Sequence, residues 1–172
     1  MSYKQRIEDS RGGLESLISK IPGYHGYKEK ENRRAADKLL RDQLTKQLDE
    51  QRRRLAELQR NLVDSGGLLM VDDLDRAVTK VQKLADKIRT ASYGYAGIFD
   101  AVKVKENELD ALYAFDEGML EQVTSVETAI DVLSTAIDTS GDVKSAIKAV
   151  VSAAGAAETT WRKRESTITG EA

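Results

Sequence analysis

The sequence predicts an all-α protein: an elongated antiparallel helical bundle, or coiled-coil hairpin, of four main helices plus a short N-terminal helix. Apolar residues recur at intervals of three and four along most of the chain, as on one face of a helix. A third of the 172 residues are charged, only 5% are aromatic and one is proline, a composition that favours helices with wide solvated faces. This length is typical of one domain, 1–172.

The N-terminal segment, 1–21, carries apolar residues at helical spacing, among them Leu14 and Leu17. Two adjacent glycines, Gly12 and Gly13, interrupt it, and each costs a helix about 1 kcal/mol relative to alanine. We therefore expect a weak or broken helix here. A turn at 22–27 follows, because it holds the only proline and two glycines.

Four longer helices are predicted after this turn. The first covers 28–64, with a stripe at Leu44, Leu48, Leu55, Leu58 and Leu62 that fits heptad positions. The second covers 71–92. The third covers 98–139 and is long enough to span roughly 60 Å. The last covers 142–168 and is rich in alanine in its middle.

The two longest segments have opposite charge. Residues 27–62 carry eleven Lys/Arg against seven Asp/Glu, a net of +4, whereas 93–140 carry two Lys against ten Asp/Glu, a net of −8. Either these helices are neighbours within one chain, or part of the acidic face meets the basic face of another copy. Exposed ion pairs contribute about 0–1 kcal/mol each, so the charges select orientation and partner rather than hold the fold.

Asp116 falls on the apolar stripe of the acidic helix, between Tyr113 and Leu120. Two interpretations stay open. The stripe drifts and the carboxylate reaches water, or it is buried with an Arg or Lys of another helix and fixes the register.

The residues expected to mediate interactions are the arginines of the basic helix, the carboxylates of the acidic helix and the tyrosines of the turn. They are Arg33, Arg34, Arg52, Arg53, Arg54, Glu106, Asp110, Asp116, Glu117, Glu121, Tyr24 and Tyr27.

No motif indicates catalysis, a cofactor or a metal. The chain has no cysteine and one histidine, His25 in the turn, so the Glu-x-x-His pairs of a di-iron bundle are missing. Arg52 to Arg54 splay around the helix beside carboxylates, which argues against nucleic acid as a partner.

For localisation, the sequence shows neither a signal peptide nor an apolar run of transmembrane length. We expect a cytoplasmic protein. Residues 1–21 are weakly amphipathic, so peripheral contact with a membrane surface is the alternative.

The run Pro22-Gly23-Tyr24-His25-Gly26-Tyr27, with the basic helix from Lys28 to Asp37 and the later Gly94-Tyr95-Ala96-Gly97-Ile98-Phe99-Asp100, resembles an uncharacterised family of bacterial helical proteins. In helix order alone, the chain is similar to phage-shock protein A and other ESCRT-III-like membrane remodellers. Neither resemblance carries over a functional residue.

These observations predict a non-enzymatic helical scaffold or adaptor that acts through protein–protein contacts and self-associates. The alternatives are a peripheral membrane-remodelling protein that polymerises on lipid and, third, a protein that binds a metal in the core of the bundle.

Overall fold

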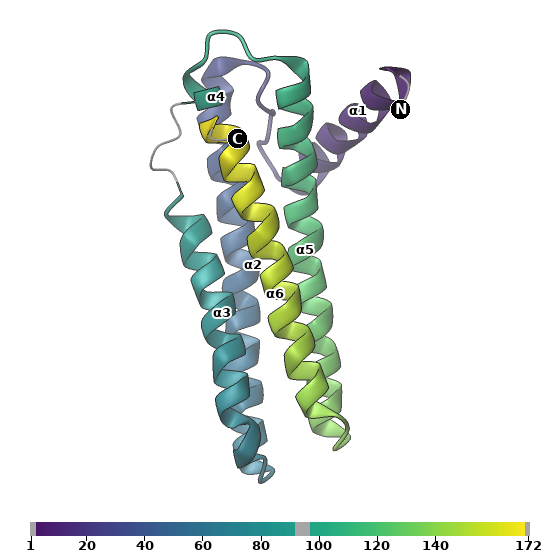
Figure 1. Cartoon of the computed structure of the whole chain (residues 1–172), viewed down its shortest axis with the longest axis vertical. Coiled ribbons are helices and arrows are strands. Elements are labelled where there is room, and N and C mark those ends of the chain that lie inside the picture. The colour runs from purple at the N-terminus through teal and green to yellow at the C-terminus, as the bar shows by residue number, and fades with distance from the viewer. Residues whose placement is uncertain (1–2, 92–96, 171–172) are drawn as a thin grey trace.

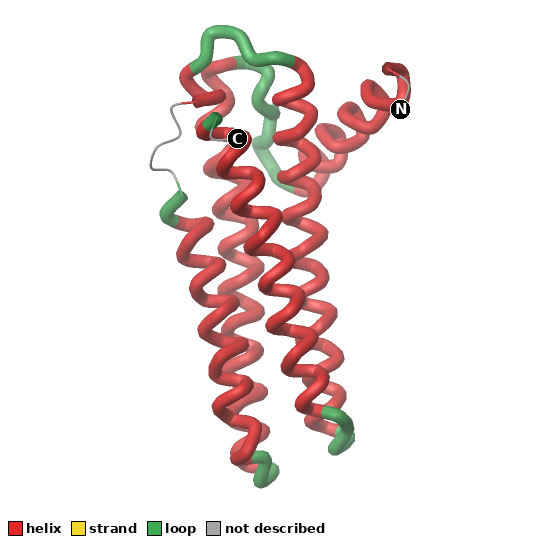
Figure 2. Tube along the Cα trace, viewed as in Figure 1, coloured by secondary structure: helices red, strands yellow, loops and turns green. Residues whose placement is uncertain are grey.

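The structure is a computed structural model that describes residues 3–91 and 97–170. Within these residues it contains six α-helices, a 3-10 turn and no strand, which confirms the all-α class (Figures 1 and 2). The elements in order are α1 (Tyr3–Lys20), α2 (Lys30–Asp64), η1 (Leu68–Met70), α3 (Val71–Arg89), α4 (Gly97–Asp100), α5 (Glu106–Asp138) and α6 (Val143–Thr169).

Two helical hairpins, α2–α3 and α5–α6, lie side by side (Figure 1). Around the bundle the order is α2, α3, α6, α5, because α2 and α6 each pack on both α3 and α5. Helices within a hairpin are antiparallel. Across the hairpins, however, α2 runs parallel to α5 and α3 runs parallel to α6. This is because α3 brings the chain back to the end of the bundle where α2 began, and α5 starts from that end.

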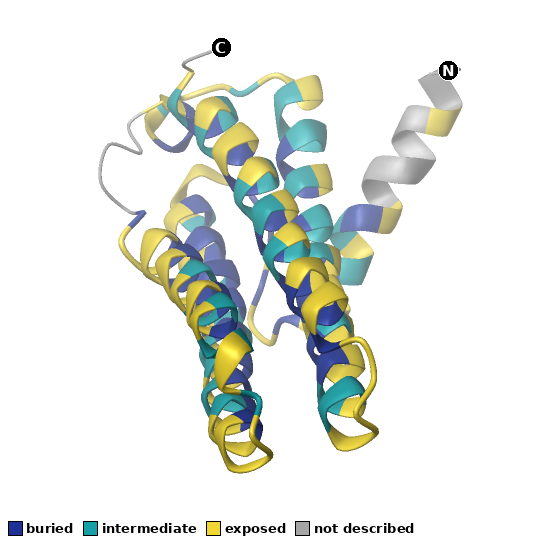
Figure 3. Ribbon diagram, turned by 60° about the horizontal axis from the view of Figure 1, so that its bottom comes forward, coloured by how far each residue is buried: buried dark blue, intermediate teal, exposed yellow. Residues whose placement is uncertain are grey.

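The core lies between the hairpins, where the buried sides of all four helices face inward (Figure 3). Burying a leucine contributes about 1.5–3 kcal/mol, and the leucine stripe of the basic helix is buried along its whole length. It packs against apolar side chains of the other helices, including Leu74, Val81 and Ile88 of α3, Leu112, Val126 and Ile130 of α5, and Val150, Ala154 and Trp161 of α6.

The N-terminal helix differs from the expectation of a weak or broken segment. α1 runs from Tyr3 to Lys20 without a break at the glycine pair. It packs on α5, where a Cβ added to Gly13 would lie 3.4 Å from a carboxylate oxygen of Glu117, and Leu17 and Ile21 are buried. Tertiary packing therefore offsets the low helix propensity of glycine.

The acidic segment also differs from the prediction. The prediction of one helix over 98–139 is wrong, because α4 ends at Asp100 and α5 begins at Glu106. Arg33 donates hydrogen bonds to the carbonyls of Ile98 (2.9 Å) and Ala101 (2.6 Å), which satisfies backbone groups that a continuing helix would use. The backbone N–H of Lys105 then donates to the Glu108 carboxylate at 3.3 Å and starts α5.

The remaining boundaries lie close to the predicted ones. α2 ends at Asp64, two glycines follow one residue later, and α6 begins after Asp142, whose carboxylate accepts the Ser145 N–H at 3.1 Å. α3 ends at Arg89, three residues before the predicted end, so it is not continuous with α5. Among the described helices, none combines the length and apolar character needed to cross a bilayer.

Candidate functional site

The most concentrated polar chemistry in the described residues lies inside the bundle, at the end where α2 and α5 begin and α6 finishes. We call it the ionic network. Its members come from the turn, α2, α5 and α6 and are all buried: Tyr24, Tyr27, Arg33, Asp37, Arg41, Asp116 and Arg164.

Arg164 of α6 is at the centre of the network and is 0% exposed. Its Nε donates to Asp116 at 2.5 Å, and its Nη2 donates to Asp37 at 2.9 Å and to the Tyr27 hydroxyl at 3.0 Å. The guanidinium also lies over the Trp161 ring, 4.9 Å from the centroid, a favourable cation–π arrangement. One buried cation is thus matched by carboxylates from two different helices.

Asp116 is the second centre of the network. Its surroundings show whether the carboxylate reaches water or is buried with a cation of another helix. It is 0% exposed and paired with an arginine of another helix. Its other oxygen accepts hydrogen bonds from the hydroxyls of Tyr27 and of Tyr24, the latter at 3.3 Å. The buried-pair interpretation is therefore correct.

Further contacts tie the network to α3, α4 and the turn. Arg41 donates to Asp37 at 2.8 Å and to the carbonyl of Arg89, the last residue of α3, at 3.1 Å. A cation at that position also suits the negative end of the helix dipole. In the turn, Tyr27 N–H donates to the Tyr113 hydroxyl at 2.8 Å.

Burial and neighbouring charge fix the protonation states of the two tyrosines and of Arg164. Burial raises the pKa of Tyr24 and Tyr27, and the negative charge of Asp116 adds to the rise, so both phenols stay protonated and donate. Burial alone would lower the pKa of Arg164, but Asp116, Tyr27 and Asp37 outweigh it and hold the pKa above its ordinary value. Burial raises the pKa of Asp116, although Arg164 and the Tyr27 hydroxyl favour the charged form.

Two polar groups in this region, Arg164 Nη1 and the Trp161 indole nitrogen, are buried and have no hydrogen-bond partner within the described chain. The carboxylates of the network, Asp37 and Asp116, form ion pairs with Arg41 and Arg164. The arrangement can lock the ends of several helices together.

This geometry corrects the expected roles of four residues. Tyr24, Tyr27, Arg33 and Asp116 were expected to mediate interactions, but they are buried inside the chain and bind each other or backbone carbonyls. They hold the fold rather than form an outer surface.

The other predicted residues lie on the outside or at its edge. Arg34 pairs with Asp100 at 2.8 Å, and Arg54 donates to Gln51 at 2.8 Å and to Asp131 of α5 at 2.5 Å. Arg53 is exposed and Arg52 half-buried on α2.

On α5, Glu106 and Glu121 are exposed, and Asp110 and Glu117 are half-buried. At 3.6 residues per turn these four lie along one side of the helix, together with Asp131. None of the four forms an ion pair with another described side chain. The basic α2 therefore neutralises little of the acidic side of α5.

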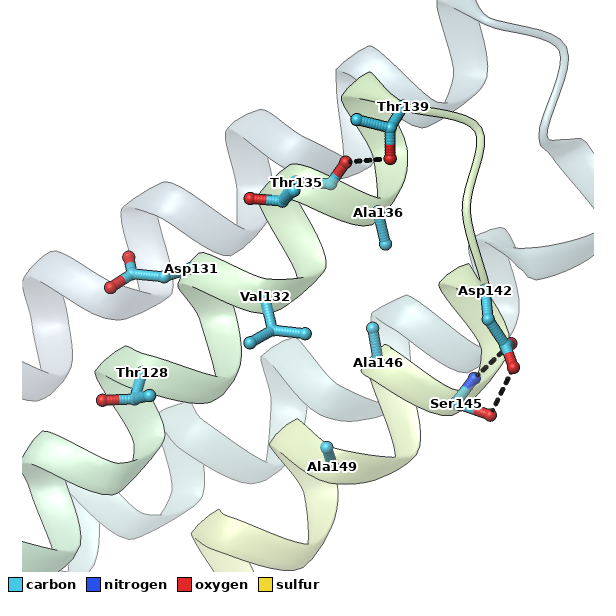
Figure 4. Close-up of a pocket in the computed structure, with 10 residues that line it drawn as sticks. All are labelled: Thr128, Asp131, Val132, Thr135, Ala136, Thr139, Asp142, Ser145, Ala146 and Ala149. Atoms are coloured by element: carbon cyan, nitrogen blue, oxygen red, sulfur yellow. Dashed lines mark hydrogen bonds between the residues drawn. The ribbon is translucent and has the colours of Figure 1, made fainter.

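A second feature is a groove of about 610 Å³ between α5 and α6, at the opposite end from the ionic network. We call it the α5–α6 groove. In Figure 4 the side chains of Val132, Ala136, Ala146 and Ala149 point into the space between the two helices. Asp131 and Asp142 lie among its lining residues, and Val132 is 55% exposed.

The α2–α3 hairpin ends at the same end of the bundle in three exposed apolar side chains, Val63 (43%), Leu68 (66%) and Leu69 (98%). We call these residues the α2–α3 tip. With Val132 they are four of the six large apolar side chains that are exposed in the described chain. Apolar surface gathered in this way marks contact sites more often than scattered exposed residues do.

Sequence reasoning missed several of these residues. Arg164 continues the apolar stripe Ala154, Ala157, Trp161 and Ile168 of α6, so its spacing signals burial in the same way as that of Asp116. The apolar run Leu68-Leu69-Met70 directly after a two-glycine turn was a signal for an exposed apolar tip.

No group of three or more potential metal ligands occurs in the part of the chain that the structure describes. Comparison of the chain with protein-family models, with curated proteins and with solved structures finds no match.

Proposed function

We propose that this chain is a non-enzymatic helical scaffold or adaptor that acts through protein–protein contacts and self-associates. The observation that carries the proposal is the concentration of exposed apolar side chains at one end of the bundle, on the α2–α3 tip and in the α5–α6 groove. Removing such surface from water drives association.

The charge pattern supports the same function. Four carboxylates on the outer side of α5 form no ion pair within the described chain and remain free to orient a partner: Glu106, Asp110, Glu117 and Glu121. Charges of this kind contribute more to orientation and association rate than to affinity. The ionic network supports a rigid scaffold, because it fixes the helix ends against one another.

The proposal is tested by the mass of the full-length chain in solution. Light scattering across a concentration series, at low and at high salt, should give a mass that rises above that of the monomer with concentration. The association should weaken as salt screens the charges. A monomer under every condition would contradict self-association.

A second candidate function, contact with a lipid surface, is favoured by one observation: Leu69 is 98% exposed and Leu68 lies beside it. Co-sedimentation with vesicles that contain anionic lipid tests it. Pelleting that is lost on the double substitution L68S/L69S would support lipid contact through the tip. If the wild-type chain does not pellet, this candidate is contradicted.

A further inference from the structure

We propose that the α2–α3 tip of one copy docks in the α5–α6 groove of a second copy, and that the reciprocal contact closes a twofold dimer through this end of the bundle. This inference rests on the proposed self-association and names the surfaces that would carry it. The occupant of the groove is thus a defined segment of a second copy of this chain.

The two surfaces match in chemistry. The tip presents Leu69 and Leu68 to solvent, at 98% and 66% exposure. The groove presents the methyl groups of Val132, Ala136 and Ala149 (Figure 4). An apolar projection and an apolar concavity on the same chain cover each other when two copies meet.

The charges around the two surfaces are complementary. In the α2–α3 hairpin, Arg54 pairs with Asp131 of the same chain. The rest of residues 52–64 carry three arginines against Glu57 and Asp64, a net of +1, and residues 71–76 carry three aspartates against Arg76, a net of −2. In the α5–α6 hairpin, residues 127–138 apart from Asp131 carry two carboxylates and no cation, a net of −2, and residues 142–148 carry two lysines against Asp142, a net of +1.

These signs select one orientation. The positive end of α2 faces the negative end of α5 of the other copy, and the negative start of α3 faces the positive start of α6. The opposite orientation would bring like charges together, which disfavours it.

The position of the two surfaces explains why the assembly closes. The tip and the groove both lie at the end of the bundle opposite the ionic network. In Figure 1 the turns that follow α2 and α5 are both at the bottom, and α4 is at the top. Two copies that meet through this end therefore make the same contact twice, as a twofold axis requires. Each dimer covers both tips and both grooves, and leaves no free surface of this kind to extend a chain of copies.

The experiment uses the full-length chain and two variants, each altered at one surface. L68S/L69S removes the apolar tip, and V132R places a bulky charge in the groove. Because these side chains are exposed, both variants should keep the helical circular dichroism and melting temperature of the wild type. V102S is the matched control, since Val102 is 82% exposed but lies outside both surfaces.

Sedimentation equilibrium and native mass spectrometry give the readout. The wild type and V102S should dimerise, and the dissociation constant of each surface variant should rise about tenfold or more, as the loss of buried leucine or valine surface predicts. An equimolar mixture of the two variants should form mixed dimers, because L68S/L69S keeps its groove and V132R keeps its tip.

Three results would overturn the inference. Dimers of the surface variants as tight as those of the wild type would exclude this interface and leave self-association standing through another one. Failure of the mixture to form mixed dimers would exclude the pairing of tip with groove. A wild-type chain that stays monomeric, whether or not its tip binds vesicles, would exclude both this interface and the proposed self-association.

Discussion

At the scale of single residues, the central feature is the buried pair of Asp116 and Arg164, which joins α5 to α6. Two charges taken out of water are expensive, and their attraction offsets this only when further hydrogen bonds satisfy the remaining oxygens and N–H groups. Here Tyr27 and Asp37 supply most of those bonds, and Arg164 Nη1 has no partner in the described chain. The pair therefore specifies how α5 and α6 align, in addition to any net stability it contributes.

The first prediction concerns this pair. D116A leaves Asp37 as the only carboxylate bonded to the buried Arg164 guanidinium. It should lower the free energy of unfolding by about 3–5 kcal/mol. Urea denaturation followed by circular dichroism measures it. The control is E117Q, one residue along α5 but outside the network, with an expected change within about 0.5 kcal/mol.

The double substitution D116L/R164M sharpens this test. Apolar residues of similar volume often replace a buried ion pair without loss of stability, and Asp37 would keep its bond to Arg41. The double variant should be more stable than D116A. An equal effect of D116A and E117Q would show that the network does not stabilise the fold.

The second prediction concerns pH and the start of α6. The pKa of Asp142 is lowered from its ordinary value of 3.8, because its carboxylate accepts the backbone N–H and the hydroxyl of Ser145. A lowered folded-state pKa means that the cap stabilises the protein above pH 3.8 and that this contribution is lost as the pH falls through the lower value.

Thermal melts at neutral and acidic pH measure this effect. D142A should lower the melting temperature at neutral pH and reduce the difference in melting temperature between neutral and acidic pH. D142N should keep the cap and lose the part of the pH dependence that comes from Asp142. A melting temperature for D142A equal to that of the wild type at neutral pH would contradict the role of the cap.

At this scale the sequence identified one partner of the pair and not the other. Asp116 was visible because it interrupts an apolar stripe. Arg164 lies 48 residues later, and its place on the apolar stripe of α6 likewise indicates that it is buried. However, the phase of one helix does not reveal which helix it faces, so the pairing emerges only from the packing of α5 on α6.

At the scale of the elements, the strongly periodic helices were predictable and the connection between α3 and α5 was not. The end of α2 follows from its leucine stripe and the glycines after it. The interruption after Asp100 depends on Arg33, which is far away in sequence and binds the carbonyls of Ile98 and Ala101. The helix propensity of this segment alone does not reveal such a long-range contact.

The third prediction tests how closely α4 packs on α6. A Cβ at Gly97 would lie 2.2 Å from the carbonyl oxygen of Ile168, which is a backbone atom that cannot swing away. G97A should therefore displace α4 and lower the free energy of unfolding by about 1–3 kcal/mol.

The matched control is another glycine-to-alanine change. Gly12 lies in α1, and a Cβ there would meet nothing within 4 Å. G12A should be neutral or raise helix stability by up to about 1 kcal/mol. Denaturation by urea, followed by circular dichroism, compares the two variants, and similar effects of G97A and G12A would show that α4 does not need a glycine there.

On the scale of the whole molecule, the two ends of the bundle differ in chemistry. One end is closed by the ionic network, which joins the turn, α2, α3, α4, α5 and α6 by hydrogen bonds and ion pairs. The other end presents the α2–α3 tip and the α5–α6 groove to solvent. Overall charge and periodicity predict the bundle, but this difference arises from which helix ends meet.

The docking of the tip in the groove can be tested directly, because the chain contains no cysteine. L69C and A149C place one thiol on the tip of one variant and one in the groove of the other. After mixing and mild oxidation, denaturing electrophoresis measures the disulfide-linked mixed dimer. We expect far more of it than from the control mixture of L69C with V102C, because disulfides require closely apposed thiols. Equal yields from the two mixtures would contradict the proposed contact.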